Sequence, residues 1–523
     1  MFCEECGTKL EDGVKFCENC GTPVPMDNTQ ENQSKAFSDD AAWKNVFYDD
    51  NWKSLWENSA KKSTGEIGII LTRSSELCSQ LSCSKDDLFA MLDDYVSSAK
   101  NRGVSYYLLD LSDNAAGASS SGNVSNVTEI LSSVCNVSPF KYLFILGNED
   151  IIEFKVWENL SSDNDENVTS DFVYTVLNET SPWNGVKYDF DKSLRVGRIP
   201  TWKGEFFSQF STYFANAKNY IGNFSSIKPY GLSALVWQKE SDDEFSVVSN
   251  NKVDVSPDVT KHNVEGRIPS DSNLFLFNLH GSNETEFWYG QDGAQYPEAI
   301  SPLNIQNISS PNFIGVEACY GAIYEKNRNA SSSNVVAALN SKTVALLGSS
   351  RIAYGTPCPP GSCADVVVGE FIKQIARGET AGDAHIAGLK QLCRGQMDDS
   401  EIKTLCEFAL YGDPSSCTGK NKNIVAGKSL VHKAIFGGRS IHIAMPDVRL
   451  AVRYSLAEVD SKIKDAINRR VYEMFENMNG IIPETFVDAN SKTYQALYRD
   501  SKKNIVKVYF DVFGHIKNMI SSK

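Results

Sequence analysis

Two short apolar stretches decide the fold of this chain: residues 274–282, with the sequence LFLFNLHGS, and residues 313–321, with the sequence FIGVEACYG. Neither stretch alternates between apolar and polar side chains, which predicts two strands buried on both faces of a parallel sheet. In an open α/β sheet, ligands bind beyond the carboxyl ends of the strands. We therefore expect His280 and Cys319, which follow these strands, to lie side by side, as a thiol nucleophile and its base require.

Strand-like and helix-like segments alternate on both sides of these two stretches. A chain of 523 residues is too long for one ordinary core. The alternation predicts an α/β fold made of two doubly wound parallel-sheet halves, residues 63–225 and 226–422. The pattern changes after them, and residues 423–523 are predicted to form a small α+β accessory domain, with a long helix near 456–477 and strands at 493–498 and 505–510.

The first 24 residues carry two cysteine pairs, Cys3 with Cys6 and Cys17 with Cys20. Four thiolates at this spacing satisfy tetrahedral zinc, and a metal replaces a hydrophobic core in so short a segment. We predict a structural zinc ribbon at residues 1–24 that docks onto a protein partner. The alternative is a pair of disulfides. Residues 25–62 are predicted to form a linker that ends in a packing helix.

Charge and hydropathy exclude several classes of function. The 51 basic and 66 acidic residues give a net charge of -15, which argues against nucleic acid as a partner. No run of eighteen apolar residues is present, so no membrane span is predicted. The N-terminus lacks the basic start and apolar core of a signal peptide, and we expect a cytoplasmic protein with reduced thiols.

Several motifs resemble one enzyme family. Residues 280–285 (HGSNET) and 317–319 (EAC) resemble the catalytic pair of gingipain-type cysteine peptidases, which belong to the caspase-like clan. Further landmarks fall in the order that this family shows: residues 146–150 (LGNED), 170–174 (SDFVY), 196–200 (VGRIP) and 411–414 (YGDP). The resemblance covers about residues 65–420, and it includes neither the ribbon nor the C-terminal domain.

The resemblance implies a cysteine endopeptidase with a caspase-hemoglobinase-like catalytic half. It implies that Cys319 is the nucleophile, that His280 is the general acid and base, and that the backbone amides of Gly281 and Cys319 form the oxyanion hole. Elementary chemistry agrees, because a thiolate attacks the carbonyl, N–H donors stabilise the oxyanion, and an imidazole protonates the leaving amine.

An acidic cluster at residues 240–244 bears on specificity. In arginine-cutting members of the family, an acidic residue in the corresponding loop pairs with the basic P1 side chain. Asp243 lies nearest to that position and Asp242 is beside it, which implies cleavage after Arg or Lys. The alternative is a solvated, acidic helix N-terminus. Glu240 is a candidate for a different role, as a third polar residue that orients His280.

A polar loop follows the Cys319 strand and contains Lys326 and Arg328. An enzyme that cuts after basic residues is able to cleave itself there, and the alternative is an ordinary surface loop. The competing hypothesis for the whole chain is a catalytically silent scaffold, built on a peptidase-like fold and a zinc ribbon, that binds a protein partner.

Overall fold

We describe the protein from a computed structural model, which defines residues 42–113, 116, 121–324, 328–395, 397–419, 454–488 and 491–523. The chain divides into two compact units, Met1–Asn45 and Val46–Lys523. In the first unit the structure describes only helix α1 (Ala42–Asn45), so the four cysteines predicted to bind zinc lie outside the described residues. The other helices and strands belong to the second unit. None of the described helices is long and apolar enough to span a membrane.

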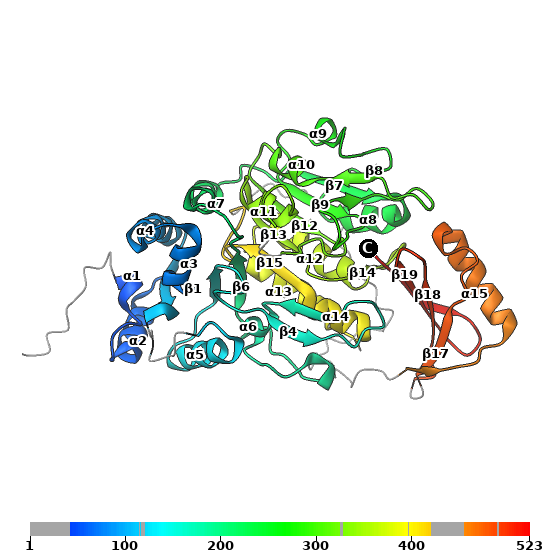
Figure 1. Ribbon diagram of the computed structural model, residues 1–523, viewed down its shortest axis with the longest axis horizontal. Helices are drawn as coiled ribbons and strands as arrows, with labels where there is room; N and C mark the ends of the chain where they lie inside the picture. Colours follow the sequence, from blue (N-terminus) through cyan, green and yellow to red (C-terminus); the bar gives the residue numbers. More distant parts are fainter. Residues whose placement is uncertain are drawn as a thin grey trace, which may run out of the picture. The chain divides into compact units, whose positions relative to one another are not determined.

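A ten-stranded sheet is the central element of the second unit (Figure 1). In spatial order its strands are β2 (Val104–Asp110), β1 (Glu66–Thr72), β3 (Tyr142–Leu146), β6 (Arg195–Ile199), β15 (Phe408–Gly412), β13 (Thr343–Ser349), β12 (Asn312–Val316), β9 (Leu274–Asn278), β7 (Pro229–Ala234) and β8 (Asp254–Ser256). The α/β prediction is confirmed. The two predicted halves share one sheet, because β15 pairs in parallel with β6 and antiparallel with β13.

Helices accompany this sheet. Several of them begin at a polar residue that caps their first turn. They are α2 (Trp52–Lys62), α3 (Ser74–Leu81), α4 (Lys85–Asn101), α5 (Val124–Val137), α7 (Phe207–Tyr220), α8 (Gln238–Phe245), α11 (Asn334–Leu339), α12 (Ala364–Ala376), α13 (Ala381–Leu392) and α14 (Asp399–Glu407). Capping boxes start α4 at Ser84 and α14 at Asp398. Trp56 of α2 is fully buried and donates a hydrogen bond to the carbonyl of Val134 on α5.

Helix α12 lies close against strand β12 because Gly315 has no side chain. A Cβ added at Gly315 would come within 2.8 Å of Val368 Cγ1 on the helix. Protein interiors are too closely packed to absorb that overlap without moving the helix. The close approach matters for the candidate site, because Asp365 lies in the first turn of α12.

Two landmark motifs of the sequence meet in a buried ion pair. Arg198 on β6 is completely buried, and its Nε and Nη2 atoms donate to the two oxygens of Asp171 at 2.8 and 2.6 Å. Its Nη1 atom donates to the carbonyls of Gly147 and Ile152 at 2.8 and 2.9 Å. This guanidinium therefore ties two separate loops, the one after β3 and the one after β5, to one strand.

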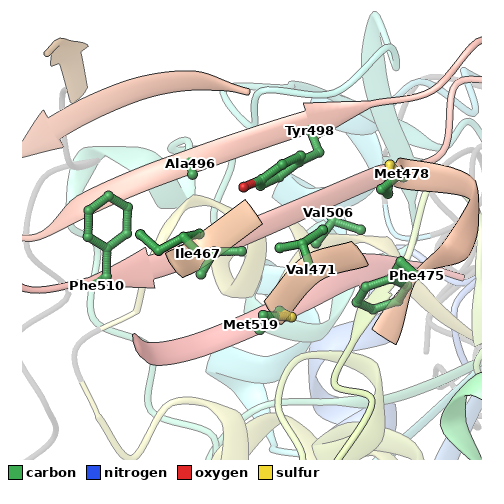
Figure 2. Close-up of a cluster of buried hydrophobic side chains, with 10 residues drawn as sticks. Ile467, Val471, Phe475, Met478, Ala496, Tyr498, Val506, Phe510 and Met519 are labelled. Atoms are coloured by element: carbon green, nitrogen blue, oxygen red, sulfur yellow. The ribbon is translucent and has the colours of Figure 1, made fainter. Parts of the chain in front are cut away.

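The C-terminal residues form the predicted α+β domain. An antiparallel sheet contains β16 (Tyr454–Leu456), β17 (Glu484–Asp488), β18 (Tyr494–Arg499), β19 (Ile505–Phe510) and β20 (Ile516–Ser522), and helix α15 (Ser461–Met474) packs on it. Figure 2 shows the core between them, in which Ile467 and Val471 of the helix meet Val506, Phe510 and Met519 of the strands. The sixth strand of this sheet, β14 (Tyr354–Gly355), comes from the segment between β13 and α12 and pairs with β20.

Removing one partner of the buried ion pair tests this description of the fold. Asp171→Ala leaves the Arg198 guanidinium buried without its carboxylate, and we expect a loss of about 3–5 kcal/mol in the free energy of unfolding. Asp189→Ala is the matched control, because Asp189 pairs with Lys192 at the surface, where an ion pair contributes little. Chemical denaturation of both variants measures the difference, and equal stabilities would contradict the account.

Candidate active site

The site begins where strands β9 and β12 end. The two strands are parallel neighbours, with Phe277 opposite Val316, so His280 and Cys319 each stand three residues beyond a paired position. Gly281 lies directly against the second strand end, since a Cβ added there would come within 1.8 Å of the Cys319 carbonyl oxygen. Only glycine fits beside His280 at this point, and the two strand ends are therefore in contact.

His280 is held between aromatic rings and a carboxamide. Its ring centroid lies 4.3 Å from that of Trp237 and 4.8 Å from that of Tyr296, and its Nε2 atom lies 2.8 Å from Gln291 Oε1. Gln291 Nε2 donates to the carbonyl of Gly293 at 3.0 Å, which fixes Oε1 as an acceptor. The hydrogen-bond network thus assigns the imidazole proton to Nε2 and leaves the Nδ1 lone pair available as a base. Burial lowers the pKa of His280 to about 4.

Cys319 is covered by the chain itself. Its backbone N–H donates to the carbonyl oxygen of Lys523 at 2.8 Å, and its thiol donates to the carbonyl of Ala353 at 3.4 Å. Only 5% of the residue is exposed. Burial raises the pKa of the Cys319 thiol above its ordinary value, so the sulfur is protonated in this state. It packs in an apolar cluster with Tyr354 of β14 and with Leu497, Ile505 and Ile520 of the C-terminal domain.

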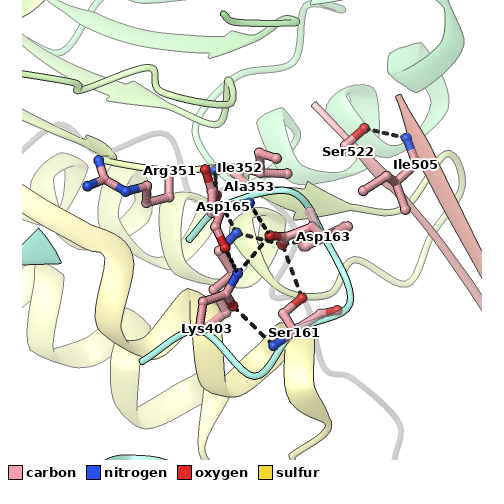
Figure 3. Close-up of polar contacts among 12 residues, drawn as sticks. Ser161, Asp163, Asp165, Arg351, Ile352, Ala353, Lys403, Ile505 and Ser522 are labelled. Atoms are coloured by element: carbon pink, nitrogen blue, oxygen red, sulfur yellow. Dashed lines mark hydrogen bonds and ion pairs between the residues drawn. The ribbon is translucent and has the colours of Figure 1, made fainter. Parts of the chain in front are cut away.

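The segment that contributes the Ala353 carbonyl is held by a second buried ion-pair network. Lys403 Nζ lies 2.6 Å from a carboxylate oxygen of each of Asp163 and Asp165. Asp165 also accepts a hydrogen bond from the backbone N–H of Ile352 at 2.8 Å (Figure 3). The backbone beside Cys319 is therefore fixed from a loop more than 150 residues earlier in the chain.

The side chain of Lys523 enters a pocket at the same strand ends. Its Nζ donates to Asn278 Oδ1 at 2.9 Å and forms ion pairs with Glu317 and Asp365. Asn278 ends β9, and Glu317 follows β12 two positions before the cysteine. Burial lowers the pKa of Lys523, but the attraction of Asp365 and Glu317 raises it by more. The net pKa is above its ordinary value, so the ammonium stays charged.

Asp365 is held firmly in place for this contact. Its second oxygen accepts hydrogen bonds from the backbone N–H of Thr356 at 2.8 Å and from that of Ser362 at 3.0 Å. Gly355 forms a wall of the pocket, because a Cβ there would come within 1.9 Å of the Lys523 side chain. The pocket therefore fits an extended basic side chain closely.

Two further carboxyl groups, those of Glu240 and Glu244, lie near Glu317 and Asp365. Burial, with the nearby charge of Asp365 next in importance, raises the pKa of Glu240 to about 9. Burial and the charge of Glu317 raise the pKa of Glu244, and burial raises the pKa of Glu317 itself to about 7 despite Lys523. Like charges this close cannot all ionise, so part of the cluster is protonated at neutral pH and one cation suffices to neutralise the rest.

The backbone before Lys523 lies along β14 as an added strand. Ser521 pairs with Gly355 and Ser522 with Tyr354 in antiparallel register. The N–H of Lys523 donates to the carbonyl of Ala353 at 3.0 Å. The chain thus reaches the Cys319 amide in an extended conformation, with its last residue at the strand ends.

The acidic residues singled out in the sequence have different surroundings. Asp242 pairs with Lys252 at 3.0 Å and accepts from the N–H of Val253, away from the pocket. Asp243 lines a cavity of about 250 Å³ that Asp365 also lines. Glu240 lines the same cavity, and the hydrogen-bond partner of His280 is Gln291.

No sequence pattern singled out five residues of this site: Gln291, Asn278, Glu317, Asp365 and Lys523. A signal existed for two of them, because Asn278 and Glu317 are polar residues at the ends of apolar strands, next to the predicted pair. The roles of Asp365 and Lys523 depend on tertiary structure, since a helix and a C-terminal strand bring them in from distant positions. Within the described ranges, no group of three or more His, Cys, Asp or Glu side chains is arranged to hold a metal ion.

The hydrogen-bond network of His280 makes a spectroscopic prediction. In protein labelled with ¹⁵N-histidine, we expect His280 to be neutral at pH 7 with its proton on Nε2, because burial lowers its pKa to about 4 and Gln291 accepts that proton. Gln291→Leu removes the acceptor and the tautomer preference, while the signals of His385, buried elsewhere, stay unchanged. An imidazolium at pH 7 or a proton on Nδ1 would contradict the arrangement.

Comparison with known proteins places this geometry in a family. Residues 2–24 match the model of a zinc-ribbon domain, and residues 75–416 match that of peptidase family C25, which is well over half of the chain. No curated protein matches the chain in sequence.

Among solved structures, the chain is similar to the Arg-specific cysteine proteinase gingipain R (RgpB), with 12% identity, a TM-score of 0.48, and coverage of 88% of this chain and 92% of that one. It is also similar to the complex of Porphyromonas gingivalis RgpB pro- and mature domains, with 13% identity, a TM-score of 0.46, and coverage of 88% and 93%. From the family match, this chain belongs to peptidase family C25 and is a cysteine peptidase that carries an N-terminal zinc-ribbon domain.

Proposed function

We propose that this peptidase hydrolyses the peptide bond that follows a lysine or an arginine, with Cys319 as nucleophile and His280 as general acid and base. One observation supports the proposal above all others. The carbonyl oxygen of Lys523 accepts from the Cys319 amide while its ammonium pairs with Glu317 and Asp365. A substrate residue on the amino side of the scissile bond, the P1 residue, would make the same contacts.

The chemistry follows from the groups at the strand ends. His280 Nδ1 takes the proton of the Cys319 thiol, and the thiolate attacks the substrate carbonyl carbon. The tetrahedral intermediate collapses to a thioester when the carbon–nitrogen bond breaks, and the imidazolium gives its proton to the leaving amine. A water molecule then attacks the thioester, passes a proton to His280, and releases the acid and the thiolate.

The oxyanion is expected to accept from the amides of Cys319 and Gly281. The Cys319 amide already holds a carbonyl oxygen at 2.8 Å, which is a suitable distance for a donor of this kind. Each such donor contributes about 3 kcal/mol to the stabilisation of the transition state. Gly281 contributes a backbone N–H without a side chain, and no larger residue fits because a Cβ would come within 1.8 Å of the Cys319 carbonyl oxygen.

Selectivity for a basic P1 side chain follows from the buried carboxylates. A neutral side chain would leave Glu317 and Asp365 buried without a cation, which costs far more than the loss of a surface contact. These two residues, rather than Asp242 or Asp243, make the ion pairs with Lys523, and we assign the P1 specificity to them.

The zinc-ribbon domain is proposed to hold one structural zinc ion through Cys3, Cys6, Cys17 and Cys20. Four thiolates leave no open coordination position, so the metal would stabilise the fold of the ribbon and take no part in hydrolysis. We further propose that the ribbon docks onto a protein partner and that the enzyme works in the reducing cytoplasm, where these thiols stay available.

Self-cleavage in the loop at Lys326 and Arg328 remains part of the proposal. Residues 325–327 lie outside the described residues, and Arg328 is next to them, with its Nη2 atom donating to the carbonyl of Asn283 at 2.6 Å. The same acidic pocket would bind the basic side chain that precedes the cleaved bond.

Fluorogenic peptides that differ only at P1 test the reaction and its specificity. We expect cleavage after Lys or Arg and not after Asp, and no cleavage by Cys319→Ala. In a Lys523→Ala background, in which the pocket is empty, Asp365→Asn should lower kcat/KM for basic P1 residues by about 10- to 100-fold, because a charged hydrogen bond is lost. Asp242→Asn, the matched control, should leave it unchanged. Absence of cleavage by the wild type and by Lys523→Ala would favour the silent scaffold.

Metal analysis tests the ribbon. Purified protein should contain about one zinc ion per chain, and Cys17→Ser should lose most of it because a tetrahedral structural site needs all four ligands. Peptidase activity in the loaded and stripped proteins should be equal if the metal is structural. Full metal content in the Cys17→Ser variant would contradict the assignment.

A further inference from the structure

We propose that residues 516–523, called the tail here, act as a built-in competitive inhibitor that occupies the substrate cleft on the amino side of the scissile bond. The inference rests on the proposed function for the identity of the cleft. It adds a regulatory role for the C-terminal domain, which neither family model covers. Figure 1 shows the C-terminus lying between this domain and strand β14 of the catalytic half.

The backbone of the tail makes the contacts that an extended peptide makes when it binds a sheet edge. Strand β14 offers only two residues, Tyr354 and Gly355, and both pair with β20. The N–H of Lys523 continues the pattern by donating to Ala353. Peptides that add a strand to an exposed edge gain affinity from these main-chain bonds and specificity from pockets for single side chains. A substrate therefore needs the edge that the tail occupies.

The side chains of the tail fill the same cleft. Lys523 is 1% exposed, and its Nζ lies 5.3 Å from the centre of the Trp237 ring, next to His280. Trp237 Nε1 donates to Ser521 Oγ at 3.0 Å, and the N–H of Ile505 donates to Ser522 Oγ at 2.9 Å (Figure 3). Each of the last three residues is thus fixed by a separate contact, and the P1 pocket is closed to any other side chain.

A second buried lysine fastens the C-terminal domain over the site. Lys507 of β19 is fully buried, and its Nζ donates to Ser400 Oγ at 2.7 Å and lies 3.3 Å from Asp399 at the start of α14. It also lies 4.5 Å from the centre of the Tyr354 ring, on the strand that the tail pairs with. Both buried lysines therefore bind the domain to the catalytic half, and of the two only Lys523 enters the P1 pocket.

Tethering makes this inhibition strong even if a single tail contact is weak. A linked ligand acts at an effective concentration of about millimolar, which exceeds the concentration of most substrates. A basic substrate and the tail compete for Glu317 and Asp365. The rate of hydrolysis is therefore limited by the fraction of enzyme molecules in which the tail has left the pocket. Release of the domain, by a partner or by cleavage, would then activate the enzyme without any change in the catalytic groups.

Replacing Lys523 tests the inference in the full-length chain. We expect Lys523→Ala to raise kcat/KM for a lysyl peptide by about tenfold or more, because truncating a buried, charged anchor weakens binding by at least that factor. Lys517→Ala is the matched control, since it removes the same charge from the tail at a position where Nζ donates to Thr493 Oγ1 of the same domain at 3.2 Å. A synthetic peptide of residues 516–523 should inhibit the Lys523→Ala variant competitively.

Alkylation of Cys319 by iodoacetamide gives a second readout that needs no turnover. Mapping by mass spectrometry should show faster labelling of Cys319 in Lys523→Ala than in wild type, with labelling of the buried Cys406 unchanged as a check on folding. Equal labelling and equal or lower activity in a folded Lys523→Ala variant would overturn the inference. Faster labelling without cleavage of any peptide would uphold the tail as a cover and refute the proposed function instead.

Discussion

The candidate site depends on one buried cation, the ammonium of Lys523. It forms ion pairs with Glu317 and Asp365 and donates a hydrogen bond to Asn278. Several carboxyl groups converge at the ends of the central strands, and burying them without a cation would be costly. The lysine neutralises them from inside its own chain. The carbonyl oxygen of the same residue accepts from the Cys319 amide. Lys523 therefore both neutralises the pocket and holds a peptide backbone at the proposed nucleophile.

The positions of the side chains in the candidate site depend on the order of strands in the sheet. Strands β7, β9 and β12 are parallel neighbours, and their carboxyl ends bring Trp237, His280 and Cys319 to one edge. Glycines make the close approaches possible, with Gly281 against the Cys319 carbonyl and Gly355 against the Lys523 side chain. The proposed catalytic pair needs such a rigid scaffold, because small displacements weaken proton transfer.

The sequence predicted the strands and the family better than the pocket. Long apolar runs such as residues 274–279 identify buried strands without tertiary information, and the boundaries of Ile505–Phe510 were matched residue for residue. Strand order was less accessible, since nothing in the periodicity shows that β15 returns to the middle of the sheet and joins the two halves. The landmarks at residues 170–174 and 196–200 are explained by the buried Asp171–Arg198 pair, which supports the fold.

The specificity residues that we propose differ from those that the sequence indicated, and the difference has a physical reason. An acidic run such as residues 240–244 is conspicuous in a sequence, whereas the ion pairs with Lys523 come from single carboxylates on separate elements, Glu317 after β12 and Asp365 on α12. Burial and convergence, which only the fold supplies, distinguish these groups from solvated charges such as Asp242.

Hydrogen exchange in the presence of a peptidyl-lysine aldehyde tests most directly whether the tail and a substrate share one site. If the proposed function holds, that ligand bonds to the Cys319 sulfur and places its own lysine in the pocket that Lys523 occupies. If the tail and a substrate share one site, the amides of Ser521, Ser522 and Lys523 should lose protection when the aldehyde binds, while those of β18 remain protected. Protection of the tail that is unchanged after Cys319 has been modified would contradict the account.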